Sequence, residues 1–436
     1  MKALLLRGGR LIDPARKLDG ERDLLIRDGR VERVGKGLSD AGAETVELKG
    51  LWVTPGFIDL HVHFRTPGQT HKETIGSGAR SAVAGGFTTV CTMANTEPPI
   101  DSVPLLEHIQ AEAARVGLLN ILPLAALTLG LRGETLTEME GLRKAGAVGF
   151  SDDGMPVMRA AVMRRALEYS RGIGVPVVSH CEDKSLSEKG IVHEGVVSAR
   201  CGLQGIPAES ETVMIARDLL LAESTGGHLH VAHVSTAAGV AMIRAAKARG
   251  VRVTAEVTPH HLMLTDEAVA GFDSRFKMNP PLRTGNDQAA LWEGLRDGTL
   301  DAVATDHAPH ATAEKEAELE HAPFGVVGLE TAFPVLYTRG VLEKRLELPA
   351  LVAALTCRPA AVLGIQRGTL AEGAIADLTV IDPTIRWTVE PVRFESKGKN
   401  SPFAGWELRG QVRDVWVAGR PVLRDRKILL QNGETA

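Results

Sequence analysis

The chain has 436 residues and carries 54 acidic against 50 basic residues, a formal net charge of −4 at pH 7. It is long enough to bury a full core without metal or disulfide staples, and the lack of a basic excess argues against a nucleic-acid-binding protein. Four cysteines, none in a CxxC pair, are too few for a disulfide framework. The sequence shows no signal peptide and no apolar run long enough to span a membrane, so we expect a cytoplasmic enzyme.

Both ends of the chain have the pattern of short β-strands. Residues 1–55 and 365–436 alternate apolar and polar side chains and are punctuated by Gly and Asp turns. Long helical periodicity is missing from both. We therefore predict one small β domain, assembled from residues 1–55 and 365–436.

The middle of the chain, residues 56–364, alternates short apolar runs with helical stretches. Eight such runs begin at residues 57, 88, 120, 147, 176, 228, 251 and 302. Strands that are apolar on both faces and alternate with helices indicate a parallel sheet, and eight units predict an α/β fold of the (β/α)8, or TIM-barrel, type. A doubly wound open sheet is the alternative. It would usually place a Gly-rich phosphate loop after its first strand, where this chain has HVHFRTPG.

Candidate metal ligands lie at the carboxyl ends of five of these runs, where a barrel builds its site. His61 and His63 are two residues apart on a strand, so their side chains point to the same face. This pair alone is weak evidence for a metal, because buried histidines can also be satisfied by packing. Other runs also end in candidate ligands, namely Asp152, Asp153, His180, His233 and Asp306. Such groups are costly to bury unpaired, and a divalent cation would pair them.

The type and number of these ligands narrow the choice of metal. Nitrogen and oxygen donors without thiolate favour zinc, with manganese or cobalt as alternatives. Six ligands exceed one tetrahedral ion, which favours two ions. Alternation along a strand lets only one of Asp152 and Asp153 point inward.

Eight other histidines are not assigned as metal ligands. We expect solvated surface positions for His71, His108, His193 and His321. His228 and His230 are expected on the face opposite His233, outside the barrel or near its bottom, and His260 and His261 at the pocket rim. Cys181 follows a ligand and is expected to be a buried, inert thiol.

Several motifs together resemble those of one enzyme family. FIDLHVHFRTPG, FSDDG, SHCED, AHVST, MNPPLR and ATDHAPH, in this order, are similar to the motifs of bacterial type I dihydroorotases, members of the amidohydrolase superfamily. The match extends to the terminal GTLAEGAIADLTVID and so covers nearly the whole chain. The resemblance implies a TIM-like barrel with a small β-sandwich formed by both termini. It also implies the reversible cyclisation of N-carbamoyl-L-aspartate to L-dihydroorotate, a step of de novo pyrimidine biosynthesis.

The resemblance further implies a two-zinc site. One zinc would be held by His61, His63 and Asp306, and the other by His180 and His233. Many relatives bridge their metals with a carboxylated lysine, which this chain lacks at FSDDG. Asp153 would bridge the two ions instead, together with a hydroxide, and Asp152 is the neighbouring possibility.

Substrate-binding residues are also implied by the resemblance. Arg65, Asn95 and His310 would bind the substrate's α-carboxylate, and a planar guanidinium can grip such a group with two hydrogen bonds. Asn279 would contact the ring, and Asp306 would act as the catalytic base. The alternatives are a surface salt bridge for Arg65, a turn for Asn95 and a rigid Asn-Pro-Pro loop for Asn279.

Three further questions stay open at this point. The charged segment 310–324 is either a flexible lid or a solvated helix. The nearest alternative activities are those of a hydantoinase or an allantoinase. A different class of protein is a non-catalytic dihydroorotase-like partner of aspartate carbamoyltransferase, although an active enzyme can bind that partner too. A homodimer is expected by analogy with the superfamily.

Overall fold

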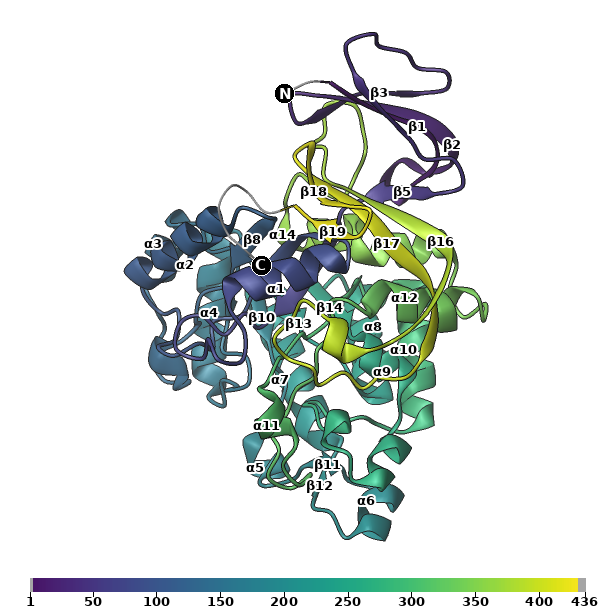
Figure 1. Ribbon diagram of the computed structural model, residues 1–436. Helices are drawn as coiled ribbons and strands as arrows, with labels where there is room; N and C mark the ends of the chain where they lie inside the picture. The colour runs from purple at the N-terminus through teal and green to yellow at the C-terminus, as the bar shows by residue number, and fades with distance from the viewer. Residues whose placement is uncertain (1–2, 430–436) are drawn as a thin grey trace.

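The computed structural model describes residues 3–429 and consists of a barrel with a β domain at one end (Figure 1). Residues 1–2 and 430–436, which belong to the predicted terminal β domain, lie outside the described residues. The N-terminal strands and the C-terminal strands lie side by side at the top of Figure 1.

Eight parallel strands form the barrel, in the order β6, β7, β8, β9, β10, β13, β14 and β15. They are Phe57–Val62, Phe87–Thr92, Asn120–Pro123, Phe150–Ser151, Val177–Ser179, Leu229–Val231, Val253–Val257 and Ala302–Val303. Parallel bridges between Ala125 and Phe150 and between Val62 and His307 close the circle. The closed circle confirms the predicted barrel and excludes the open sheet.

Helices cover the outside of the barrel and connect successive strands. The longer ones are α1 (Ile75–Ala84), α2 (Val103–Val116), α3 (Met139–Lys144), α4 (Ala160–Ile173), α7 (Glu209–Thr225), α8 (Ala237–Ala248), α10 (Gly285–Asp297), α13 (Leu348–Leu355) and α14 (Cys357–Leu363). In α4, Val162, Met163, Ala166 and Leu167 recur at helical spacing and are buried against the barrel. This helix ends where Gly174 adopts a positive φ of 75° and donates its N–H to the carbonyl of Ser170.

A nine-stranded sheet makes up the β domain. Its strands are β1 (Leu4–Asp13), β2 (Leu18–Arg27), β3 (Arg30–Gly35), β4 (Glu44–Glu47), β5 (Trp52–Pro55), β16 (Leu378–Thr388), β17 (Glu407–Val417), β18 (Arg420–Arg424) and β19 (Lys427–Ile428). Antiparallel pairing of β5 with β16 joins the two ends of the chain. Their buried side chains share one core, which includes Leu24, Val53 and Trp416. A β domain from both termini is thus confirmed, while its boundaries at residues 55 and 365 stay a prediction.

Short helices and strands lie in the connections that follow the carboxyl ends of the barrel strands. The connection from β10 to α7 contains α5 (Lys184–Ser187), β11 (Val192–His193), α6 (Val196–Cys201) and β12 (Gly205–Ile206). Other connections contain α9 (Pro259–Met263), α11 (Thr312–Lys315) and α12 (Ala332–Leu336). These connections surround the side chains at the strand ends.

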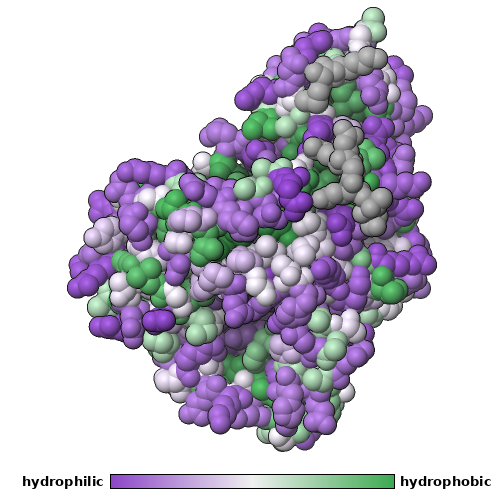
Figure 2. Space-filling model, turned by 60° about the vertical axis from the view of Figure 1, so that its left-hand side comes forward, coloured by the Kyte–Doolittle hydropathy of each residue, from purple (hydrophilic) through white to green (hydrophobic). Residues whose placement is uncertain are grey.

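The surface is mostly polar. Figure 2 shows hydrophilic side chains over most of one face, with apolar side chains in small patches between them. Within residues 3–429, no helix combines the length and apolar character needed to cross a membrane.

Candidate metal centre and substrate pocket

The predicted ligands converge at the carboxyl ends of five strands. His61 lies in β6, His63 just after it, and the others follow β9, β10, β13 and β15. All six are nearly inaccessible to solvent, with 6% exposure or less. His233 and Asp306 adopt positive φ angles of 32° and 48°, which non-glycine residues rarely do. The bends in the chain after β13 and β15 therefore coincide with two of the predicted ligands, as backbone strain at functional sites often does.

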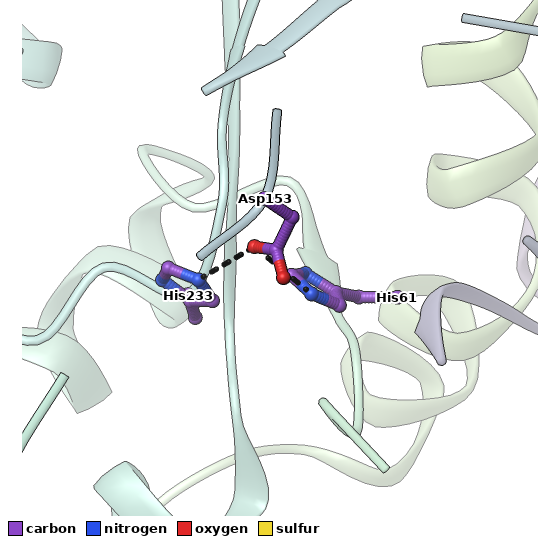
Figure 3. A group of neighbouring side chains, drawn as sticks. All are labelled: His61, Asp153 and His233. Carbon is purple, nitrogen blue, oxygen red and sulfur yellow. Dashed lines mark ion pairs between the residues drawn. The ribbon is translucent and has the colours of Figure 1, made fainter. Parts of the chain in front are cut away.

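Asp153 lies at the centre of the cluster. Its Oδ1 is 3.4 Å from His61 Nε2, 3.4 Å from His180 Nδ1 and 3.5 Å from His233 Nε2. Figure 3 shows the carboxylate between the rings of His61 and His233. The Oδ2 atom is 3.5 Å from His63 Nε2, so both oxygens of Asp153 face histidines of the cluster.

Asp306 is the second carboxylate of the cluster and lies beside His63 and His61. Its Oδ1 lies 3.2 Å from His63 Nε2 and 3.5 Å from His61 Nε2. Ligand atoms at about 2.1 Å from a tetrahedral zinc ion stand about 3.4 Å from one another, so these separations suit a shared cation. His61 belongs to both candidate groups of ligands, His61 with Asp153 and His233, and His61 with His63 and Asp306.

Three neighbouring groups fix the tautomers of the histidines. His61 Nδ1 is 3.0 Å from Glu256 Oε1, and His180 Nε2 is 2.9 Å from Glu182 Oε2. Because an ionised carboxylate only accepts, each ring donates that N–H and keeps a lone pair on its other nitrogen. His63 Nδ1 likewise lies 2.9 Å from Asn95 Oδ1 and donates to it.

The lone pairs of His61 and His63 then point at carboxylate oxygens, and His180 Nδ1 lies 2.9 Å from His233 Nε2. His61 Nε2 and Asp153 Oδ1 are buried and have no hydrogen-bond partner. Two acceptors at this distance repel each other unless positive charge lies between them. Burial alone would lower the pKa of His61, but the carboxylates of Asp153 and Asp306 outweigh burial and raise that pKa well above its ordinary value. The residues therefore fit a pair of divalent cations, which would supply that positive charge.

The two neighbouring aspartates have different surroundings. Asp152 Oδ1 accepts from the N–H of Leu127 at 2.8 Å and of Thr128 at 3.0 Å, and Oδ2 accepts from the Thr128 hydroxyl. It holds the end of β8 to the end of β9 and does not face the histidines. Asp153 alone points into the cluster, in agreement with strand alternation.

A cavity of about 290 Å³ opens above the cluster. It is lined by residues that include all four predicted substrate ligands, Arg65, Asn95, Asn279 and His310. Arg65 is half-buried, its Nε donates to the carbonyl of Pro309 at 3.3 Å, and burial lowers its pKa. A guanidinium that lines a cavity is suited to an anionic ligand.

Comparisons with known proteins agree with this geometry. A family model described as dihydro-orotase-like matches residues 50–238. The chain is 52% identical to a dihydroorotase of Pelotomaculum thermopropionicum over 98% of its own length and 99% of that protein. It is also 52% identical to a dihydroorotase of Anaeromyxobacter dehalogenans, over 97% and 98%. The chain belongs to the dihydroorotase family.

The solved structures place this dihydroorotase-family chain in a wider fold group. An L-hydantoinase from Arthrobacter aurescens matches 99% of the chain and 98% of its own with a TM-score of 0.89, at 27% identity. A D-hydantoinase from Thermus sp. matches with a TM-score of 0.82, also at 27% identity. The barrel with its terminal β-sandwich is therefore the fold of hydantoinases as well, and the two families share it.

Two buried carboxylates of this dihydroorotase-family site escaped the sequence analysis. Glu182 accepts from His180, from Lys184 Nζ at 2.6 Å and from Asn279 Nδ2 at 2.9 Å. Glu256 bridges His61 and His230, with its Oε2 3.0 Å from His230 Nε2. Glu182 follows His180 by two residues and could have been found by strand alternation, whereas no local pattern connects Glu256 to His61.

Several positions of other histidines were predicted wrongly. His230 points into the barrel toward Glu256, because the bend at His233 ends the alternation on which the prediction depended. His193 is 8% exposed, with Nδ1 3.0 Å from Arg283 Nη1, and is not a surface residue. His260 and His261 are buried and do not line the cavity. Cys181 is buried in the apolar core, as expected.

The segment 310–324 is held in place by buried lysines. It contains the short helix α11, and Lys315 Nζ donates to the carbonyls of Lys277, Pro323 and Gly325. Lys277 Nζ donates to the carbonyls of Leu319 and Glu320. In this structure the segment is thus neither an untethered lid nor a simple solvated helix.

Proposed function

We propose that this chain is a dihydroorotase that converts N-carbamoyl-L-aspartate and L-dihydroorotate into each other. The observation that carries the proposal is a buried cluster of four histidines and two aspartates beneath a cavity that contains a half-buried arginine. The 52% identity to dihydroorotases over nearly the full length supports the same activity.

We propose zinc as the metal and Asp153 as the bridge between two ions. His61, His63 and Asp306 would hold one ion, and His180 and His233 the other. The donor set of imidazole and carboxylate without thiolate supports zinc. When bound, such ions act as Lewis acids that polarise a carbonyl oxygen and acidify water.

The remaining chemistry belongs to side chains of the chain. Asp306 would accept a proton in one direction and return it to the ring nitrogen in the other, with its carboxylate at the floor of the cavity. Burial raises the pKa of that carboxyl, but His61 and His63 outweigh burial and hold it well below its ordinary range. The group is therefore ionised at neutral pH.

The substrate's α-carboxylate would bind to Arg65, Asn95 and His310. Arg65 supplies the charge, and Asn95 and His310 line the same cavity wall. Burial, followed by the charges of Arg65 and Lys72, lowers the pKa of His310 to about 3, so its ring is neutral. Asn279, fixed by Glu182, would contact the ring of dihydroorotate.

Sequence identity and the charge of Arg65 both bear on whether the chain is instead a hydantoinase. Hydantoinases share the fold at 27% identity, against 52% for the dihydroorotases. A neutral hydantoin would leave the half-buried charge of Arg65 without a counter-charge from the substrate, which is costly. Both arguments favour an acidic substrate.

A substrate panel tests the proposal. Purified, zinc-loaded protein should hydrolyse L-dihydroorotate and should hydrolyse hydantoin and allantoin at least about 100-fold more slowly in kcat/KM, since the unpaired arginine costs about 3 kcal/mol. Hydrolysis of hydantoin but not of dihydroorotate would refute it. A zinc-free chain that co-purifies with aspartate carbamoyltransferase would favour the non-catalytic partner. The homodimer, that partner and the cytoplasmic location stay predictions of the sequence.

A further inference from the structure

The connection between β16 and β17, residues 389–406, leaves the terminal β domain and runs over the barrel (Figure 1). Apolar contacts fix it there. Phe403, which is 1% exposed, packs with Val335 of α12 and edge-on against Trp406, with the two ring centroids 5.1 Å apart. We call residues 394–401 of this connection the strap.

One side chain of the strap reaches the wall of the substrate cavity. Asn400 is 4% exposed, and its amide nitrogen donates to the carbonyls of Gly325 at 3.0 Å and Ala308 at 3.4 Å. Its Oδ1 accepts from the N–H of His310 at 3.3 Å. The three partners all line the cavity. Asn400 thus joins two separate wall segments, the one after β15 and the one before α12.

Close packing leaves these wall segments little freedom. A Cβ at Gly325, whose φ is 133°, would lie 2.8 Å from the carbonyl oxygen of Ala308 and 3.0 Å from His310 Nε2. A Cβ at Gly398 in the strap would lie 2.7 Å from Pro309 Cβ. The two walls also bond to each other directly, since Ala308 donates its N–H to the carbonyl of Val326 at 2.8 Å and His310 Nε2 lies 2.7 Å from the carbonyl of Phe324. Within residues 394–401, only Asn400 bonds to both walls through its side chain.

A second set of hydrogen bonds connects the strap, through Glu73, to His307, the residue after the proposed base Asp306. The N–H of Lys397 and the hydroxyl of Ser396 donate to Glu73. Glu73 is fully buried, and its Oε2 lies 3.4 Å from Nε2 of His307, the residue after Asp306. The strap thus contacts the segment 306–310 at both of its ends.

We propose that Asn400 is a positioning residue of the substrate site, through which the terminal β domain holds the wall segment that carries His310 against the wall segment that carries Gly325. Asn400 itself does not line the cavity and acts through His310 and Gly325. Its contribution is therefore to substrate binding and not to the metal centre. The inference rests on the proposed function, because the kinetic test measures KM for dihydroorotate.

The test compares Asn400→Ala with Asn120→Ala in the full-length, zinc-loaded protein. Asn120 is a matched control, because its side chain also bonds to a backbone carbonyl, that of Thr88 at 2.8 Å, but at the start of β8, the other end of the barrel. For Asn400→Ala we expect KM for dihydroorotate to rise about tenfold, the equivalent of one or two hydrogen bonds, with kcat within about threefold and full zinc content. Asn120→Ala should leave KM unchanged.

Hydrogen exchange gives a readout that does not need activity. The His310 amide should exchange at least about tenfold faster in Asn400→Ala, because it loses its acceptor, and peptides covering 306–312 report this. If Asn400→Ala does not fold, Asn400→Ser, which keeps one polar group, takes its place. Unchanged KM with unchanged exchange would overturn the inference, as would loss of zinc or an equal rise in KM in Asn120→Ala. A wild-type protein without dihydroorotase activity would refute the proposed function, and the exchange rates would still decide the role of Asn400.

Discussion

Replacing Glu256 by Gln should weaken metal binding without unfolding the barrel. The carboxylate accepts from His61 Nδ1 and His230 Nε2, both at 3.0 Å, so each ring uses its N–H on Glu256. In Gln, one oxygen becomes an NH2 group, which confronts one of these two donors. If it faces His61, that ring must move its proton to Nε2 and can no longer offer a lone pair to a metal.

If the NH2 group faces His230 instead, that ring must move its proton, and its hydrogen bond to Thr254 changes as well. His230 Nδ1 lies 2.8 Å from the hydroxyl of Thr254, which in turn lies 2.9 Å from His228 Nε2. Reversing His230 would turn its Nδ1 into a donor, and the Thr254 hydroxyl would lose the acceptor to which its own O–H is donated. Either way one charge-assisted hydrogen bond is lost, which is worth about 1.5–3 kcal/mol. We therefore expect zinc affinity to fall about 10- to 100-fold, as for other partners of metal-binding histidines.

Competition with a chromophoric chelator measures this affinity directly. Glu330→Gln is the matched control, because it makes the same chemical change in a half-buried carboxyl that bonds to Ser81 and Ser396. The control should keep wild-type zinc affinity. Unchanged zinc affinity in Glu256→Gln, with the metal-free protein still folded, would refute the argument from tautomers.

Three other outcomes follow from the structure. Arg65→Lys should raise KM for dihydroorotate about tenfold or more with little change in kcat, because an ammonium cannot form the paired contact, and steady-state kinetics will show whether KM moves. Asp153→Asn should lose bound metal, whereas Asp152→Asn should keep it and lower the melting temperature through its weakened bond to Leu127, and metal analysis with thermal melts separates the two. Burial raises the pKa of Glu330 to about 7. The folded state therefore holds the proton more tightly than the unfolded chain, and stability falls as pH rises from about 4.5 to 7. Glu330→Gln should match wild type near pH 4 and exceed its stability at pH 8, and denaturant unfolding at the two pH values checks this.

Much of the fold could be predicted because its pattern is local. Each barrel strand coincides with an apolar run, since a strand between the barrel interior and a helix layer is buried on both faces. The joining of the two ends followed from their shared strand pattern. The ligands His61 and His63 were also readable, because two residues two apart on a strand share a face.

The wrong or missed predictions concern residues whose position depends on a local bend of the backbone or on a partner far away in the sequence. Alternation put His230 and His233 on opposite faces, but the positive φ at His233 interrupts the strand, and both rings point inward. Glu256 and His61 are 195 residues apart, so their contact depends on barrel closure and not on any short motif. The burial of His193 likewise depends on Arg283, 90 residues away.

The most direct test of the two-metal site is a zinc titration of chelator-stripped protein, followed by the hydrolysis of L-dihydroorotate. The six ligands and the bridging position proposed for Asp153 predict no activity in the stripped protein and a rise that levels off at two zinc ions per chain. Full activity without metal, or no hydrolysis after both ions are restored, would contradict the account.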